Sequence, residues 1–101
     1  IIGITCHNSI KFAKEAIKNK ASYIAFGSFF PTKTKKVIYK SKINTLNKAK
    51  KFTNIPVVAI GGITNVNYKK LLLNNANFLA ISGYVWNNKK YKPKEAIESL
   101  I

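Results

Sequence analysis

A short run of hydroxyl and amine side chains, Pro31-Thr32-Lys33-Thr34-Lys35, follows an apolar segment that ends at Gly27. In an extended loop, Thr32 and Thr34 project to the same side, and Lys35 can then reach over a group held by their hydroxyls. Three donors that converge at the end of a strand make a suitable cradle for phosphate or pyrophosphate. An ordinary surface loop rich in Lys and Thr has the same composition, so the motif alone leaves both interpretations open.

Small and polar residues also follow the other apolar runs of the chain. They are Thr5-Cys6-His7, Gly61-Gly62 and Ser82-Gly83. The carboxyl ends of parallel strands meet at one edge of a sheet, and in (β/α)₈ barrels this edge carries the active site. A phosphate is often bound there by loop amides and a helix N-terminus. Paired glycines also occur simply to make a tight turn from strand to helix.

Four short apolar runs predict the strands that position these groups. They cover residues 1–4, 23–26, 57–60 and 78–81. None of them alternates polar with apolar residues, as a half-exposed antiparallel strand would. Continuous apolar strands are typical of a parallel sheet that is covered on both faces.

Helical patterns lie between and after these strands, and each pattern has one apolar face. The first begins near Asn8 or Ser9, where a capping side chain is available, and the fourth begins with Pro93 in its first turn. The expected faces are Ile10, Ala13, Ala16 and Ile17; Ile43, Leu46 and Ala49; Val66, Leu72 and Leu73; and Ala96, Ile97, Leu100 and Ile101. The order βαβαβαβα predicts right-handed crossovers and an α/β fold.

The charge of the chain is strongly positive. Its net charge is +15, from 18 Lys and no Arg against three Glu and no Asp. Such a charge attracts polyanions. However, Arg is the residue that contacts guanine through two hydrogen bonds, and the lysines are spread over every predicted helix and loop. We therefore expect weak, salt-sensitive contact with polyanions and no specific nucleic-acid binding.

Length and cysteine content limit the remaining possibilities. A chain of 101 residues holds at most one domain, and its first residues already predict a strand, so we expect it to be part of a longer protein. No run is long enough to span a membrane, and no export signal is visible, so we expect a cytoplasmic location. Cys6 stands alone, which excludes an internal disulfide and a cysteine-based zinc cluster. We interpret it as a small packed side chain, since spacing identifies no partner base.

Four stretches together resemble the thiamine-phosphate synthase family, in order and in approximate spacing. They are Gly3-Ile4-Thr5-Cys6-His7-Asn8-Ser9, Pro31-Thr32-Lys33-Thr34-Lys35-Lys36, Pro56-Val57-Val58-Ala59-Ile60-Gly61-Gly62-Ile63 and Ala80-Ile81-Ser82-Gly83. The resemblance covers essentially the whole chain, and the Pro-Thr-x-Thr-Lys block is its most specific part. It implies that residues 1–101 are a single partial domain, the C-terminal half of a (β/α)₈ TIM barrel with about four βα units.

The resemblance also implies a reaction. The family joins a hydroxymethylpyrimidine diphosphate to a thiazole phosphate, releases pyrophosphate and requires Mg²⁺. Stabilising the charge of the leaving pyrophosphate and positioning the thiazole nitrogen are the tasks of such a catalyst, and no protein nucleophile is needed. By resemblance, Lys35 and Thr5 are catalytic and contact the pyrophosphate. The implied substrate-binding residues are Thr32, Lys33, Thr34, Gly62, Ile81 and Ser82, of which the last three hold the phosphate of the thiazole.

The chain departs from the family in its metal site. The family holds Mg²⁺ with two Asp residues, whereas this chain contains no Asp, and its three Glu all fall on predicted helices. We therefore expect no metal ligand in this chain, with the Mg²⁺ ligands in the missing N-terminal half, and we expect the 101 residues alone to be inactive. The expected partners are small phosphate substrates, without a membrane, together with self-association or the missing half of the barrel.

Two alternatives stay open at this stage. A related branch, the thiazole tautomerases, also has a histidine at the position of His7, which could act as an acid or base near neutral pH. That branch generally lacks the Pro-Thr-x-Thr-Lys block, which favours the synthase. The other alternative is a catalytically inactive remnant that binds phosphates through its Lys-rich surface.

Overall fold

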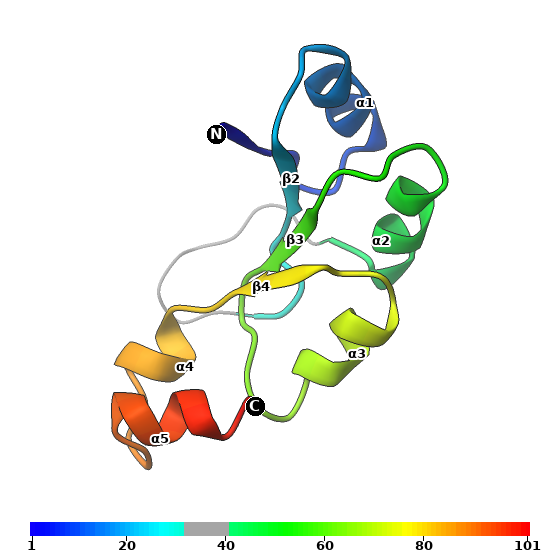
Figure 1. The fold of residues 1–101 in the computed structure, drawn as a ribbon. Helices are drawn as coiled ribbons and strands as arrows, with labels where there is room; N and C mark the ends of the chain where they lie inside the picture. The colour runs from blue at the N-terminus through cyan, green and yellow to red at the C-terminus, as the bar shows by residue number, and fades with distance from the viewer. Residues whose placement is uncertain (32–40) are drawn as a thin grey trace.

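The computed structural model describes residues 1–31 and 41–101, which form one parallel sheet with helices. The strands are β1 (Gly3–Thr5), β2 (Tyr23–Phe26), β3 (Val57–Ile60) and β4 (Phe78–Ala80). They lie side by side in the order β1-β2-β3-β4, and all three pairings are parallel. The four strands predicted from the apolar runs and the α/β class are therefore confirmed (Figure 1).

Helix α1 (Ile10–Lys18) follows β1 and begins where its capping residue predicts. The Ser9 hydroxyl accepts a hydrogen bond from the backbone N–H of Phe12 at 3.0 Å, which satisfies one of the unpaired donors of the first turn. Ala13 and Ala16 are buried against the sheet, so the predicted apolar face of this helix is confirmed.

Helices α2 (Ile43–Lys50) and α3 (Tyr68–Leu73) follow β2 and β3. Figure 1 shows α1, α2 and α3 along the same side of the sheet. The core lies between this helical layer and one face of the strands. Its largest fully buried side chains are Phe26, Ile24, Leu46, Leu71, Val57 and Cys6.

Within the described residues, no helix covers the opposite face of the sheet, so the cover predicted for both faces is found here on one face. Tyr23, Ile60 and Phe78 point to this face, because their neighbours Ile24, Ala59 and Leu79 pack into the core. Phe78 is 61% exposed and Ile60 is 43% exposed. We call these three side chains, Tyr23, Ile60 and Phe78, the inner face. The strands are apolar on both faces, and continuous apolar runs cannot reveal which face is covered.

The third predicted helix is displaced in the structure. Val66 lies in the turn before α3 and is 89% exposed, and Leu73 is also exposed, so the predicted apolar face is wrong. Leu71 is the fully buried residue of α3. Three consecutive leucines fit more than one helical register, so the spacing of apolar residues could not select Leu71.

The C-terminal part of the chain contains two short helices where the sequence predicted one. Helix α4 (Gly83–Trp86) directly follows β4, and α5 (Pro93–Glu98) follows after a polar loop. Pro93 occupies the first turn of α5, as predicted. Ala96 is buried, whereas Ile97 and Ile101 remain exposed. No helix in the described parts of the chain is long and apolar enough to cross a membrane.

Candidate functional site

The ends of the four strands meet at one edge of the sheet. Because the strands are parallel and adjacent, the residues that follow Thr5, Phe26, Ile60 and Ala80 all emerge at this edge. The structure thus brings the strand-end groups onto a common edge, as the sequence predicted. The roles assigned to these residues remain predictions.

The end of β1 is fixed by backbone hydrogen bonds. The N–H of Cys6 donates to the carbonyl of Ala25 at 2.7 Å, which extends the pairing with β2 by one residue. His7 then adopts a left-handed backbone with φ 54°, and its carbonyl accepts a hydrogen bond from the Gly27 N–H at 3.1 Å. Thr5 is exposed at the end of the strand, and His7 is half-buried.

Cys6 is fully buried beneath this edge. Burial raises the pKa of its thiol above the usual value of 9.0, because removal from water disfavours the thiolate. A thiol that stays protonated is a poor nucleophile. The interpretation of Cys6 as a packed side chain is therefore confirmed.

The chain leaving β2 runs alongside the end of β3. The N–H of Phe30 donates to the Gly61 carbonyl at 3.2 Å, and the N–H of Phe29 lies 3.4 Å from the Ile60 carbonyl. Gly61 has φ 104°, and a Cβ built on it would stand 2.1 Å from Oγ of Ser28. Glycine at this position lets the two chains approach each other closely.

Gly62 continues this contact and begins the turn towards α3. It has φ 67°, and its carbonyl accepts a hydrogen bond from Nδ2 of Asn67 at 3.1 Å. Oδ1 of Asn67 in turn accepts from the N–H of Thr64 at 2.8 Å. One side chain therefore fixes both ends of the turn from residue 62 to residue 64.

The end of β4 leads directly into α4. Ile81 is half-buried and Ser82 is exposed. The Ser82 carbonyl accepts hydrogen bonds from the N–H groups of Val85 and Trp86, at 3.1 and 3.0 Å. The hydroxyls of Thr5 and Ser82 therefore lie at the same sheet edge as the Gly61-Gly62 turn, and hydroxyl and amide groups are suitable for contacting phosphate oxygens.

The most specific block of the sequence, Thr32, Lys33, Thr34 and Lys35, lies outside the described residues. Its predicted contacts with phosphate and pyrophosphate stay predictions. The flanking residues Phe30 and Ser41 lie at the strand-end edge, hydrogen-bonded to Gly61 and to Ser28 respectively.

No group of three or more His, Cys, Asp or Glu side chains in residues 1–31 and 41–101 is arranged to hold a metal ion. Glu15 lies on α1, while Glu95 and Glu98 lie on α5. Oε1 of Glu95 accepts a hydrogen bond from the Lys92 N–H, and Glu98 lies 3.9 Å from Lys94 in an exposed ion pair. Mg²⁺ prefers carboxylate and phosphate oxygens in an octahedral arrangement, and these three Glu side chains of the described residues do not form such a site.

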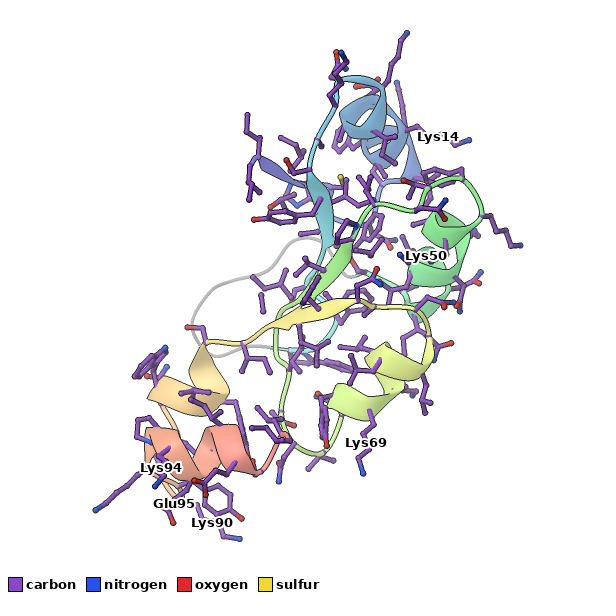
Figure 2. The ribbon with its side chains drawn as sticks, in the orientation of Figure 1. Lys14, Lys50, Lys69, Lys90, Lys94 and Glu95 are labelled. Carbon is purple, nitrogen blue, oxygen red and sulfur yellow. The ribbon has the colours of Figure 1, made fainter. Side chains whose placement is uncertain are left out.

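The lysines that the structure describes are spread over several elements. Figure 2 shows labelled lysines on several elements rather than along one stripe: Lys14 on α1, Lys50 on α2, Lys69 on α3 and Lys94 on α5. Some of these cations lie over aromatic rings; Nζ of Lys14 is 5.3 Å from the centre of the Phe52 ring. This distribution gives no support to a dedicated nucleic-acid surface.

Three polar residues that hold the strand ends in place escaped prediction from the sequence. They are Asn8 and Ser41, which bond to residues of other parts of the chain, and Asn67, which bonds within its own turn. Asn67 had a local signal, since an Asn three residues after Thr64 can close a turn with its side chain. The contacts of Asn8 and Ser41 join residues more than 30 positions apart, and one sequence carries no signal for such pairs.

Comparison with known proteins assigns the chain to a family. A family model described as thiamine monophosphate synthase matches residues 1–85. The chain belongs to the thiamine monophosphate synthase family. It is 65% identical over 100 residues to the thiamine-phosphate synthase of Pelagibacter ubique (strain HTCC1062), a match that covers 99% of this chain and 48% of the relative. It is 45% identical over 82 residues to the thiamine-phosphate synthase of Nitrosomonas eutropha (strain DSM 101675 / C91 / Nm57), covering 81% of this chain and 39% of the relative.

Solved structures agree with this assignment. The thiamine phosphate pyrophosphorylase from Pyrococcus furiosus superposes with a TM-score of 0.84 at 33% identity, covering 99% of this chain and 46% of that one. A structure described as "Native KDPGal structure" superposes with a TM-score of 0.66 at 15% identity, which supports the fold alone, and covers 97% and 44%. The chain thus spans about half the length of the relatives it matches, and its four-stranded sheet corresponds to about half of a TIM-barrel-like fold.

Proposed function

We propose that this chain is the C-terminal half of a thiamine-phosphate synthase. The complete enzyme would join a hydroxymethylpyrimidine diphosphate to a thiazole phosphate and release pyrophosphate. The observation that carries this proposal is the 65% identity over 100 residues to a thiamine-phosphate synthase, which extends across all the strand ends. In this proposal residues 1–101 are one partial domain, and the cytoplasm is its compartment.

The proposed roles are those that the family resemblance implies. Thr5 and Lys35 contact the pyrophosphate, and Thr32, Lys33 and Thr34 lie close to the two substrates. The turn at Gly62, together with Ile81 and Ser82, holds the phosphate of the thiazole. Exposed hydroxyls at Thr5 and Ser82 support this arrangement, because both are accessible to a small phosphorylated molecule.

Binding and orientation are the chemistry that these residues can supply. Negative charge accumulates on the pyrophosphate as its bond to the pyrimidine carbon breaks, and an ammonium with hydroxyl donors stabilises that charge. A second phosphate held at the ends of β3 and β4 would direct the thiazole nitrogen towards the same carbon. His7 is proposed as an acid or base only for the alternative tautomerase reaction. Mg²⁺ would supply further charge stabilisation, from ligands outside this chain.

A complete barrel tests the proposal. This chain is joined to the unmatched half of the Pelagibacter ubique relative, and formation of thiamine phosphate and pyrophosphate is measured with Mg²⁺. We expect activity that requires both substrates, and we expect Lys35→Ala to abolish pyrophosphate binding in isothermal titration. Lys69→Ala, on the helical side of the sheet, is the control for loss of one positive charge (Figure 2).

The alternatives give different results in the same barrel. A tautomerase would leave pyrophosphate unbound and would lose its activity on replacement of His7. An inactive remnant would bind pyrophosphate weakly, and both lysine variants would weaken that binding equally, with a strong dependence on salt. Either result would overturn the proposed function.

A further inference from the structure

A polar cluster joins the end of β1 to both ends of the connection between β2 and α2. The His7 carbonyl accepts hydrogen bonds from the Gly27 N–H at 3.1 Å and from Oγ of Ser41 at 2.6 Å. The N–H of Ser41 also donates to the Ser28 carbonyl at 2.8 Å. The chain that leaves β2 and the chain that returns to α2 are therefore bonded to each other and to the residue after β1.

Asn8 completes this cluster through a single side-chain atom. Its Oδ1 accepts a hydrogen bond from the N–H of Lys42 at 3.0 Å and another from Oγ1 of Thr45 at 2.6 Å. Lys42 is the N-cap residue directly before α2, and its own side chain makes no capping hydrogen bond. Asn8 thus binds the N–H of the N-cap residue from a different loop, a bond that in a capping box comes from a Glu or Gln of the helix itself.

The cluster is shielded from water at its side-chain hydroxyls, whereas Lys42 is exposed. Ser41 and Thr45 are each 6% exposed, and Asn8 is half-buried. Loss of the Asn8 acceptor leaves the buried hydroxyl of Thr45 without this partner and opens the Lys42 N–H to water. The position of the α2 start relative to the end of β1 therefore depends directly on Asn8.

We propose that Asn8 is a positioning residue for the end of β1 and so for Thr5, one of the candidate phosphate-binding groups that the structure describes at the strand ends. Asn8 lies three residues after Thr5 and holds the returning chain at Ser41 and Lys42 against the end of β1. It thereby fixes the position of the β1 end, which carries Thr5, relative to the start of α2. This inference rests on the proposed function and names a residue that touches no substrate itself.

The test variants are chosen by whether they keep the acceptor oxygen of Asn8. Both hydrogen bonds use Oδ1 of Asn8, so Asn8→Asp keeps both acceptors and Asn8→Ala removes both. Asn47→Ala is the matched control: Asn47 also lies on α2, and its side chain bonds to Asn74 and Asn75 rather than to a strand end. Each Ala variant removes one side-chain amide with its hydrogen bonds.

Two measurements are made on the complete barrel described above. Hydrogen exchange reports the protection of the Lys42 N–H, which we expect to fall in Asn8→Ala and to be retained in Asn8→Asp and Asn47→Ala. Steady-state kinetics report positioning: we expect Asn8→Ala to lower kcat/KM by about tenfold at a temperature where the variant is folded, since small displacements of binding groups are costly. Asn47→Ala should remain within about twofold of the parent protein.

The outcomes separate this inference from the proposed function. If Asn8→Ala loses Lys42 protection and melts at a lower temperature but keeps its kcat/KM, Asn8 is merely structural and the inference is wrong. If Lys42 protection is unchanged, the hydrogen bonds of Asn8 do not hold the start of α2, and the inference also fails. An inactive parent barrel would instead count against the proposed function itself.

Discussion

Gly62 lies directly against the carbonyl oxygen of Phe30. A Cβ built on Gly62 would stand 2.6 Å from that oxygen and 2.7 Å from the carbonyl oxygen of Pro31. Both neighbours are backbone atoms, so they cannot move aside as a flexible side chain would. The end of β3 and the chain leaving β2 can therefore pack in this way only because residue 62 has no side chain.

We expect Gly62→Ala to destabilise the protein by about 1–3 kcal/mol, because the new methyl group meets two carbonyls and φ of 67° is strained for alanine. Urea unfolding monitored by circular dichroism measures the change. Asn65→Ala, at an exposed position of the following turn, is the control and should change stability by less than about 0.5 kcal/mol. Equal stability of the two variants would contradict this account of Gly62.

Asn77 joins β3 to β4 at their amino ends. Its N–H donates to the Val57 carbonyl at 2.8 Å, and its Oδ1 accepts from the Val57 N–H at 2.9 Å. Because Val57 is fully buried, Asn77→Ala leaves its N–H unpaired, and we expect a loss of about 1–3 kcal/mol in the free energy of unfolding. Asn77→Asp keeps the acceptor and should lose less. If Ala and Asp are equally destabilising, the side-chain hydrogen bond to Val57 is not the cause.

The sequence predicted those features that depend on local patterns. The continuous apolar runs located all four strands, and Ser9 located the start of α1. Both signals can be read from a few consecutive residues, because a buried strand is a short apolar run and a helix cap is a single side chain near the first turn. Because adjacent parallel strands end at the same edge of a sheet, the strand positions were enough to predict that Thr5, Gly61-Gly62 and Ser82 lie along one edge. The buried residue of α3 was not predicted, since Leu71 has apolar neighbours at 72 and 73.

Features that depend on residues far apart in the sequence were not predicted. The hydrogen bond between Asn8 and Thr45 joins positions 37 residues apart, and neither residue belongs to a local motif that indicates the other. Which side chains lie on the open inner face was also not predicted: Phe78 and Leu79 are both apolar, and only the packing of helices distinguishes the covered face from the open one.

The thiol of Cys6 should make stability depend on pH in the alkaline range. Burial raises its pKa in the folded protein above the usual 9.0, so the folded state retains the proton more strongly than the unfolded state does. The stabilisation is complete below pH 9.0 and is lost as the pH rises through the folded pKa, with a slope of at most about 1.4 kcal/mol per pH unit.

The measurement is the difference in unfolding free energy between the parent chain and Cys6→Ala, taken from pH 7 to pH 10.5 in reducing buffer. Lysine and tyrosine titration affects both proteins alike and cancels in this difference. We expect the difference to be constant up to about pH 9 and then to shift against the parent chain. A difference that does not change over the whole range would show that the thiol is not held in its neutral form by folding.

The inner face of the sheet should drive self-association of the chain. Phe78 and Ile60 lie together on a sheet face that no described helix covers, with β1 and β4 as the two outer strands. Such apolar area and unpaired strand edges favour association, while the net charge of +15 opposes it. We therefore expect association in sedimentation velocity that increases with protein concentration and with added salt, because salt screens the repulsion.

Replacement of one exposed side chain on each face locates the association. Phe78→Ser should reduce it strongly, because the substitution removes the most exposed apolar ring of the inner face. Leu73→Ser is the matched control, since Leu73 is 83% exposed but belongs to α3 on the helical side. If both variants reduce association equally, general surface hydrophobicity and not the inner face is responsible. If added salt weakens the association, charge attraction and not apolar contact holds the copies together.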